Sequence, residues 1–186
     1  MPATFAWAQY VGSVTNSTTF NASGTTGTSS AAAMSWDFET ADNTGTQTYT
    51  ANPVSAGSYS YPVWLKGYFT NSVGYTIQNI KFWQFNPATN SANTNTFGIW
   101  GTVQANYSVA TGTSSGTAYA SNSQVGTSAN STTAPGNALT MAGSISAGGA
   151  ATLVTQSYIC LQLTASSAAP AGTSGYFGFT MQYDEQ

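Results

Sequence analysis

Hydrophobic and polar residues alternate with a period of two along much of this chain. In residues 61–69, YPVWLKGYF, every second position is apolar, and the positions between them carry two large rings and a lysine. Such alternation is typical of a β-strand with one buried face. The same pattern predicts strands over residues 4–10, 33–39, 75–85, 97–109, 153–163 and 175–186, and a weaker strand over 137–145.

The alternation also predicts which side chains face the core. For the stretch 97–109 we expect one continuous strand of thirteen residues, with Trp100 on the opposite face from the apolar positions. The inward positions of the clearest strands are Val63, Leu65 and Phe69; Phe97, Ile99, Val103, Tyr107 and Val109; Ile159, Leu161 and Leu163; and Phe177, Phe179, Met181 and Tyr183.

Residues 75–85, YTIQNIKFWQF, change phase within the segment. Ile77 and Ile80 are three positions apart, so strict alternation would place them on opposite faces. One extra residue in a strand restores a common face, and this is the effect of a β-bulge. The sequence therefore predicts a bulge near Gln78 and Asn79.

No segment shows a helical period of 3.6 residues with capping residues at its ends. Seven or eight strands separated by turns rich in Gly, Ser, Thr and Asn indicate an all-β fold. The pattern favours an antiparallel β-sandwich, jelly-roll or Ig-like, with long Ser/Thr/Asn-rich loops. Residues 1–186 fit one such domain, for which we expect an extended N-terminal arm at 1–30 and a long loop at 111–136.

The composition restricts the function more than any motif does. Charged residues make up 4% of the chain, the net charge is −3, and Lys66 and Lys81 are the two basic residues. Binding to nucleic acid or to an anionic membrane needs many more positive charges. The chain has no histidine, the residue on which acid–base catalysis at neutral pH and transition-metal sites usually rely. We expect no enzymatic activity, no cofactor and no metal site.

Cys160 is the single cysteine, so the chain forms no internal disulfide. It lies in the strand pattern SYICLQL, where we expect it to be a small buried apolar residue. The N-terminal residues lack a basic segment followed by an apolar one, and no apolar run reaches 18 residues. From this pattern we expect synthesis in a cytoplasm without a signal peptide, and no membrane span.

Three acidic residues, Asp37, Glu39 and Asp42, cluster in the segment WDFETADNTG. The simplest interpretation is a solvated acidic strand end. Carboxylate oxygens so close together also suit calcium, and paired carboxylates can hydrolyse glycosides. No catalytic motif accompanies the third alternative, and the first is the one we favour.

Among the five tryptophans, Trp64, Trp83 and Trp100 are the candidates for an interface or for a ligand-binding surface. Flat rings on a strand can stack on sugars. Large rings also fill cores and subunit interfaces, and we give this second interpretation more weight.

Three segments, PVWLKGYFT, IQNIKFWQF and GYFGFTMQYDEQ, resemble a group of tailed-phage virion structural proteins, the capsid decoration (cement) proteins and head fibres. The signature positions are Trp36–Phe38, Asn79–Trp83 and Gln182–Glu185. The resemblance implies a β-sandwich, often trimeric, that binds the major capsid protein on the virion surface after synthesis in the host cytoplasm. It implies no catalytic residue. The alternative is a carbohydrate-binding or host-attachment module of a phage fibre or tail.

Overall fold

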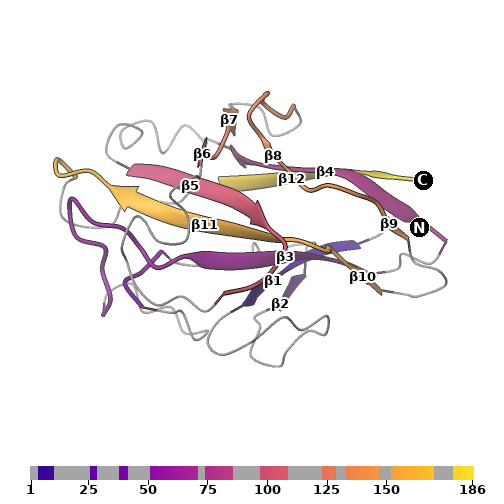
Figure 1. Ribbon diagram of the computed structural model, residues 1–186, viewed down its shortest axis with the longest axis horizontal. Coiled ribbons are helices and arrows are strands. Elements are labelled where there is room, and N and C mark those ends of the chain that lie inside the picture. Colours follow the sequence, from indigo (N-terminus) through magenta and orange to yellow (C-terminus); the bar gives the residue numbers. More distant parts are fainter. Residues whose placement is uncertain are drawn as a thin grey trace.

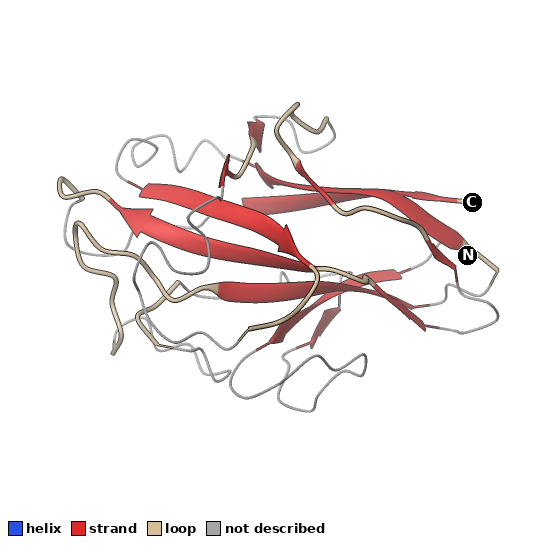
Figure 2. Ribbon diagram, in the orientation of Figure 1, coloured by secondary structure: helices blue, strands red, loops and turns tan. Residues whose placement is uncertain are grey.

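The computed structural model describes residues 4–10, 26–28, 38–41, 51–70, 74–85, 97–108, 123–128, 133–146, 152–169 and 178–186. These residues contain strands and no helix (Figure 2). The all-β prediction is therefore confirmed for the described part of the chain. In those same residues, no helix is present that could cross a membrane.

The first sheet has the strand order β2–β1–β3–β11–β5–β6, and β10 also pairs with β3 (Figure 1). Every pairing in this sheet is antiparallel. Its strands are β1 (Thr4–Tyr10), β2 (Thr26–Thr28), β3 (Val63–Thr70), β5 (Phe97–Gln104), β6 (Ser123–Gln124), β10 (Thr152–Val154) and β11 (Tyr158–Ala165).

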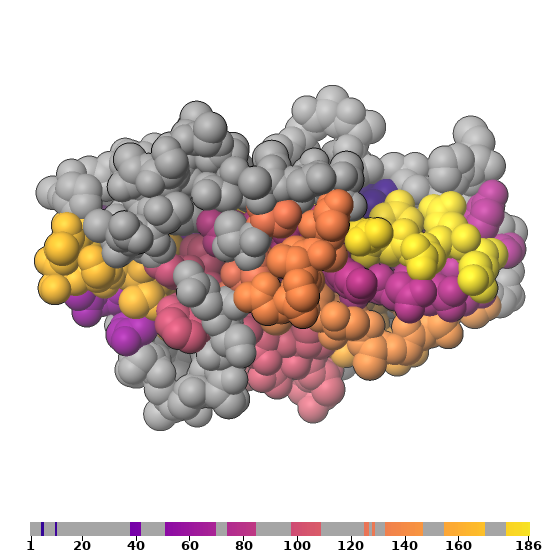
Figure 3. All heavy atoms as spheres, turned by 90° about the horizontal axis from the view of Figure 1, so that it is seen from above, coloured from indigo at the N-terminus to yellow at the C-terminus, as the bar shows by residue number. Residues whose placement is uncertain are grey.

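The second sheet has the order β12–β4–β7, and β8 and β9 pair with other parts of β4. The β4–β7 pairing is parallel and the others are antiparallel. Seen from above, β12, β4, β8 and β9 form one surface of the molecule (Figure 3). The strands are β4 (Thr76–Phe85), β7 (Thr127–Ser128), β8 (Leu139–Thr140), β9 (Ile145–Ser146) and β12 (Gly178–Glu185).

One hydrophobic core joins the two sheets. Tyr183 of β12 packs edge-on against Phe69 of β3, with ring centroids 4.9 Å apart, and Phe5 of β1 lies 5.2 Å from Phe69. The rings of Phe82 and Phe179 stack at 5.3 Å. The buried core residues are Val63, Leu65, Phe69, Ile77, Ile80, Phe82, Ile99, Val125, Met141, Ile159, Leu161 and Leu163. Phe179, Met181 and Tyr183 pack against this core, as their alternation predicts.

The expected strand 97–109 is shorter than its pattern indicates. β5 ends at Gln104, and Ala105 and Asn106 form a bend. Ile99 enters the core as expected, but Tyr107 does not. Tyr107 belongs to a separate buried cluster that includes Trp64. Because Trp64 alternates with core residues along β3, it lies on the face of the sheet that points away from the core. The prediction of one continuous strand was therefore wrong beyond Gln104.

The expected strand at 153–163 is divided into β10 and β11. Between them, a buried threonine makes hydrogen bonds to β3 in place of regular strand pairing. Thr155 is 1% exposed. Its Oγ1 accepts a hydrogen bond of 3.0 Å from the backbone N–H of Gly67, and its own N–H donates to the Gly67 carbonyl at 2.9 Å. The hydroxyl also donates to the Ser157 carbonyl at 2.9 Å. β3 thus pairs with β10 on one side of Gly67 and with β11 on the other.

The predicted bulge lies in β4 at the expected position. Lys81 pairs with Gln182 and Gln78 pairs with Asp184, so two residues of β4 lie opposite Tyr183 alone. Asn79 takes a φ of 52°, a left-handed conformation that asparagine adopts more readily than most residues. The extra residue lets both Ile77 and Ile80 enter the core.

Short strands also occur where the composition indicated loops. β6 and β7 fall inside the range 111–136, and Val125 between them is 1% exposed. β2 falls inside the range 1–30, where an extended arm was expected, and it pairs with β1, the strand predicted at 4–10, in the first sheet. The weak strand at 137–145 is present as the two short strands β8 and β9.

The expected strand at 33–39 lies mostly outside the described residues. Residues 38–41 are described and are not in a strand.

Candidate binding surface

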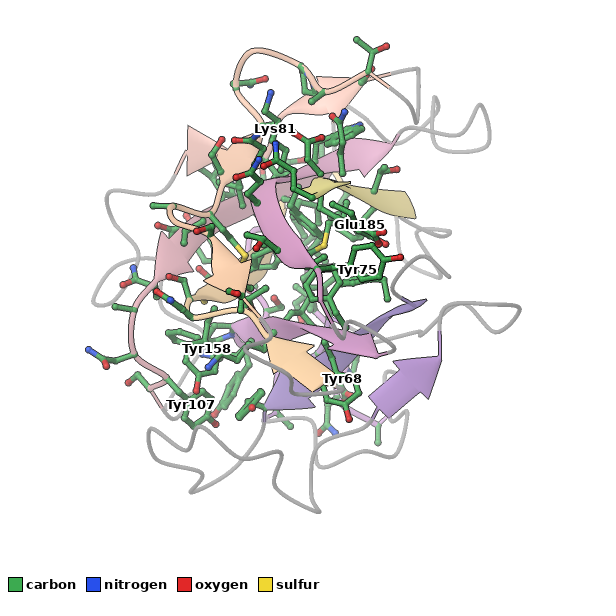
Figure 4. The ribbon with its side chains drawn as sticks, turned by 90° about the vertical axis from the view of Figure 1, so that its right-hand side faces the viewer. Tyr68, Tyr75, Lys81, Tyr107, Tyr158 and Glu185 are labelled. Carbon is green, nitrogen blue, oxygen red and sulfur yellow. The ribbon has the colours of Figure 1, made fainter. Side chains whose placement is uncertain are left out.

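The outer face of the first sheet, the face that points away from the core, carries a buried aromatic cluster. We call Tyr10, Trp64, Tyr107, Tyr158 and Cys160 the aromatic cluster. Tyr107 comes from the segment after β5, and its ring contacts the other three rings, with centroids 5.4 to 6.1 Å away. Figure 4 shows Tyr107 beside Tyr158. The fold thus buries rings on both faces of the first sheet, and Cys160 is buried as expected.

Lys66 lies at the side of this cluster. Its side chain is 5% exposed, and its Nζ lies 4.4 Å from the centroid of the Tyr158 ring. Burial lowers the pKa of the Lys66 amine from its usual value because the charged form loses hydration. The ring face offsets part of that loss through a cation–π contact. Among the described residues, no carboxylate forms an ion pair with Lys66.

Tyr10 has a buried hydroxyl that makes no hydrogen bond within the described part of the chain. Burial raises the pKa of Tyr10 to about 12, with a further contribution from Tyr158. Burial also raises the pKa of Tyr158. Both shifts have the sign expected for phenols that leave water.

Trp100 is the one large hydrophobic side chain that is exposed in the described residues, at 39%. It lies on the same outer face as the aromatic cluster, and its strand partners there are Gln162 and Gln124. Thr102 and Gln104 follow it at alternate positions of β5 and are half-buried. The ring therefore stands among hydroxyl and amide groups.

The other two candidate tryptophans are placed differently. Trp64 is 2% exposed and belongs to the aromatic cluster, and Trp83 of β4 is 0% exposed. Two of the three rings are thus buried within a single chain. Trp100 is the candidate that a ligand or a partner protein can reach directly.

The acidic segment also departs from the expectation. Glu39 is 1% exposed, so the interpretation as a solvated strand end was wrong for this residue. Asn52 Nδ2 donates to Glu39 Oε2 at 3.4 Å, and the Tyr61 N–H donates to the Glu39 carbonyl at 2.7 Å. Asp37 and Asp42 lie outside the described residues. Within the described ranges, no three residues of the metal-binding types come together.

Charges are segregated between the two sheets. Lys81 and Asp184 are exposed and Glu185 is half-buried, and all three belong to strands of the second sheet. Figure 4 labels Lys81 and Glu185. Lys66 is the one charged residue in the described strands of the first sheet, and it is buried. The described surface of the first sheet is therefore neutral.

Sequence reasoning did not predict the aromatic cluster. Its members come from β1, β3, β11 and the segment after β5, and strand pairings between such distant segments cannot be read from one sequence. The available signal was the rings on the nominally polar faces, such as Trp64 beside Lys66. Comparison of the chain with protein-family models, with curated proteins and with solved structures finds no match.

Proposed function

We propose that this protein is a non-enzymatic structural protein of a virion, a capsid decoration protein that binds the major capsid lattice at the particle surface. We also propose that its two sheets form an antiparallel β-sandwich. Support comes from the three segments that resemble tailed-phage decoration and head-fibre proteins, since they make up most of β3, β4 and β12. Those strands contribute to the shared core.

The observation that carries the proposal is the neutral outer face with Trp100 at its surface. A face without exposed charge binds through apolar area and neutral hydrogen bonds. For a ring of about 250 Å² that is 39% exposed, roughly 100 Å² remains to be buried. At about 25 cal/mol per Å², Trp100 would contribute about 2.5 kcal/mol, or roughly 60-fold in affinity. Repeated attachment sites on a lattice multiply such modest contacts.

The test is co-sedimentation of the purified protein with capsids assembled from the major capsid protein of the same genome. We expect binding to change little between low salt and about 1 M salt, because screening weakens mainly exposed charge pairs. Trp100→Ala should weaken binding about 60-fold. Lys81→Ala, an exposed position on the second sheet, is the matched control and should bind normally. Loss of most bound protein at moderate salt, or normal binding by Trp100→Ala, would contradict the proposal.

A second candidate function uses the same ring. An exposed tryptophan among threonine and glutamine side chains also suits stacking on a neutral sugar, as in a carbohydrate-binding or host-attachment module of a fibre or tail. That function would favour a row of exposed rings, and Trp100 is the single exposed ring of this kind in the described residues. Binding of neutral oligosaccharides that Trp100→Ala abolishes, together with no capsid binding, would favour this second function.

We also propose that the protein assembles as a trimer, as the resemblance to decoration proteins implies. Rings on both faces of the first sheet do not by themselves require an interface between copies, because the aromatic cluster buries several of them within a single chain.

A further inference from the structure

Gln162 of β11 is a buried amide on the outer face of the first sheet. Leu161 and Leu163 on either side of it point into the core, so alternation places Gln162 on the opposite face. Its side chain is nevertheless 5% exposed. Burying an amide costs free energy unless its hydrogen-bonding groups find partners. A buried amide in the middle of an outer face therefore indicates a specific role.

Ser60, in the segment before β3, holds the Gln162 amide in place. Nε2 of Gln162 donates a hydrogen bond of 2.8 Å to the Ser60 carbonyl. Ser60 is fully buried and is itself attached to β11. Its N–H donates to the Leu163 carbonyl at 2.9 Å, and its Oγ accepts from the Leu163 N–H at 3.0 Å. The amide of Gln162 is therefore anchored to a backbone position that is fixed from two sides.

Trp100 lies directly opposite Gln162 in the pairing of β5 with β11. The side chains of directly opposed residues in antiparallel strands share a face of the sheet, with Cβ atoms about 4.5–5.5 Å apart. Gln162 thus lies between Ser60, on the β3 side of β11, and Trp100, on the β5 side. Contact between the indole ring and the anchored amide accounts for the burial of Gln162 and for the partial burial of Trp100.

We propose that Gln162 is a positioning residue for Trp100. Anchored at Ser60, it supports the indole ring and holds it in one orientation at the surface before a partner binds. A side chain that is ordered in advance loses less conformational entropy on binding, so this support adds to the affinity that Trp100 supplies through buried area. The inference rests on the proposed function, in which Trp100 contacts the partner, but the motion of the ring can be measured without any partner.

The first experiment is ¹⁹F NMR of the full chain labelled with 5-fluorotryptophan, in which Trp100→Phe identifies the Trp100 signal. Gln162→Met keeps the side-chain length and removes the donor to Ser60. In this variant the relaxation of the Trp100 signal should report increased ring motion. Gln104→Met is the matched control, because Gln104 is an amide on the same face of β5 that lies opposite Tyr158. Unchanged Trp100 relaxation in Gln162→Met, or an equal change in Gln104→Met, would overturn the proposal.

The second experiment is a double-mutant cycle measured by co-sedimentation with capsids. Gln162→Met should weaken binding about 2- to 12-fold, the range expected for ordering one side chain, and should have no further effect in the Trp100→Ala background. Equal weakening in both backgrounds would show a general structural role and would overturn the proposal. If the unaltered chain does not bind capsids, the proposed function fails, and the relaxation of Trp100 still decides whether Gln162 positions the ring. Gln162→Thr, a residue suited to strands, serves both experiments if Gln162→Met does not fold.

Discussion

Gly101 is the position at which a single methyl group should disturb the core most directly. A Cβ built on Gly101 would lie 2.6 Å from a Val125 methyl, 2.9 Å from a Leu161 methyl and 3.0 Å from a Leu139 methyl. These side chains come from the segment between β6 and β7, from β11 and from β8. The absence of a side chain at position 101 therefore lets Val125, between β6 and β7, and Leu139 of β8 pack on the middle of β5.

The magnitude of the Gly101→Ala effect follows from two opposing terms. To reach an ordinary separation of 3.4 Å, the Val125 methyl would have to move by about 0.8 Å (3.4 − 2.6). Overpacking of this kind costs roughly 1–3 kcal/mol. Replacing a strand glycine by alanine returns about 0.5–1 kcal/mol. From the midpoints of these two ranges (about 2 − 0.75), we expect the free energy of unfolding to fall by about 1 kcal/mol, which corresponds to a melting temperature lower by roughly 2–4 °C.

The assay is denaturant unfolding followed by tryptophan fluorescence and circular dichroism. Gly136→Ala is the control, because its φ is not left-handed and no atom lies within 4 Å of its Cβ position. In the double variant Gly101→Ala/Val125→Ala the new methyl should occupy part of the vacated volume, so its loss should be smaller than the sum of the two single losses. Equal stability of Gly101→Ala and the unaltered protein, or strict additivity in the double variant, would refute the packing of residues 125 and 139 on β5.

Three further predictions test other parts of the fold. Asn79→Ala should lower the free energy of unfolding by about 1–2 kcal/mol because alanine is strained at a φ of 52°, whereas Asn79→Gly should lie within about 0.5 kcal/mol of the parent in the same denaturant assay. Burial raises the pKa of Tyr10 from 10.0 to about 12, so the contribution of its neutral form to stability is complete below pH 10 and is lost between pH 10 and 12. Tyr10→Phe should therefore make the melting temperature depend less on pH across that range. An unchanged dependence of the melting temperature on pH would contradict the burial of this phenol. Cys160 is fully buried, so Ellman's reagent should label the thiol only as fast as the protein opens, and immediate labelling of the native protein would show that the aromatic cluster is open.

Much of the fold is predictable because alternation is a local property. The core faces of β3, β11 and β12 and the bulge in β4 follow from positions that neighbour one another in sequence, such as Ile77 and Ile80. The bulge in particular needs no knowledge of the partner strand, since the phase of the apolar residues changes within β4 itself.

The remainder depends on which segments meet. Tyr107 fits the β5 alternation, yet the bend at Ala105 and Asn106 places it among rings from β1, β3 and β11. Glu39 and Lys66 look like surface charges in the sequence, and the chain buries both of them. The candidate binding surface was predictable only in part, because Trp64, Trp83 and Trp100 have similar local patterns and differ in what covers them.

Under the proposed function, the protein is a component of the particle surface that binds its lattice in many copies. The most direct test is a mass-spectrometric count of this chain against the major capsid protein in purified particles. We expect a fixed ratio near the number of equivalent lattice sites, maintained after washing in about 1 M salt, because neutral contacts are weakly screened. Absence of the chain from purified particles, or only a few copies in each, would contradict the proposed function.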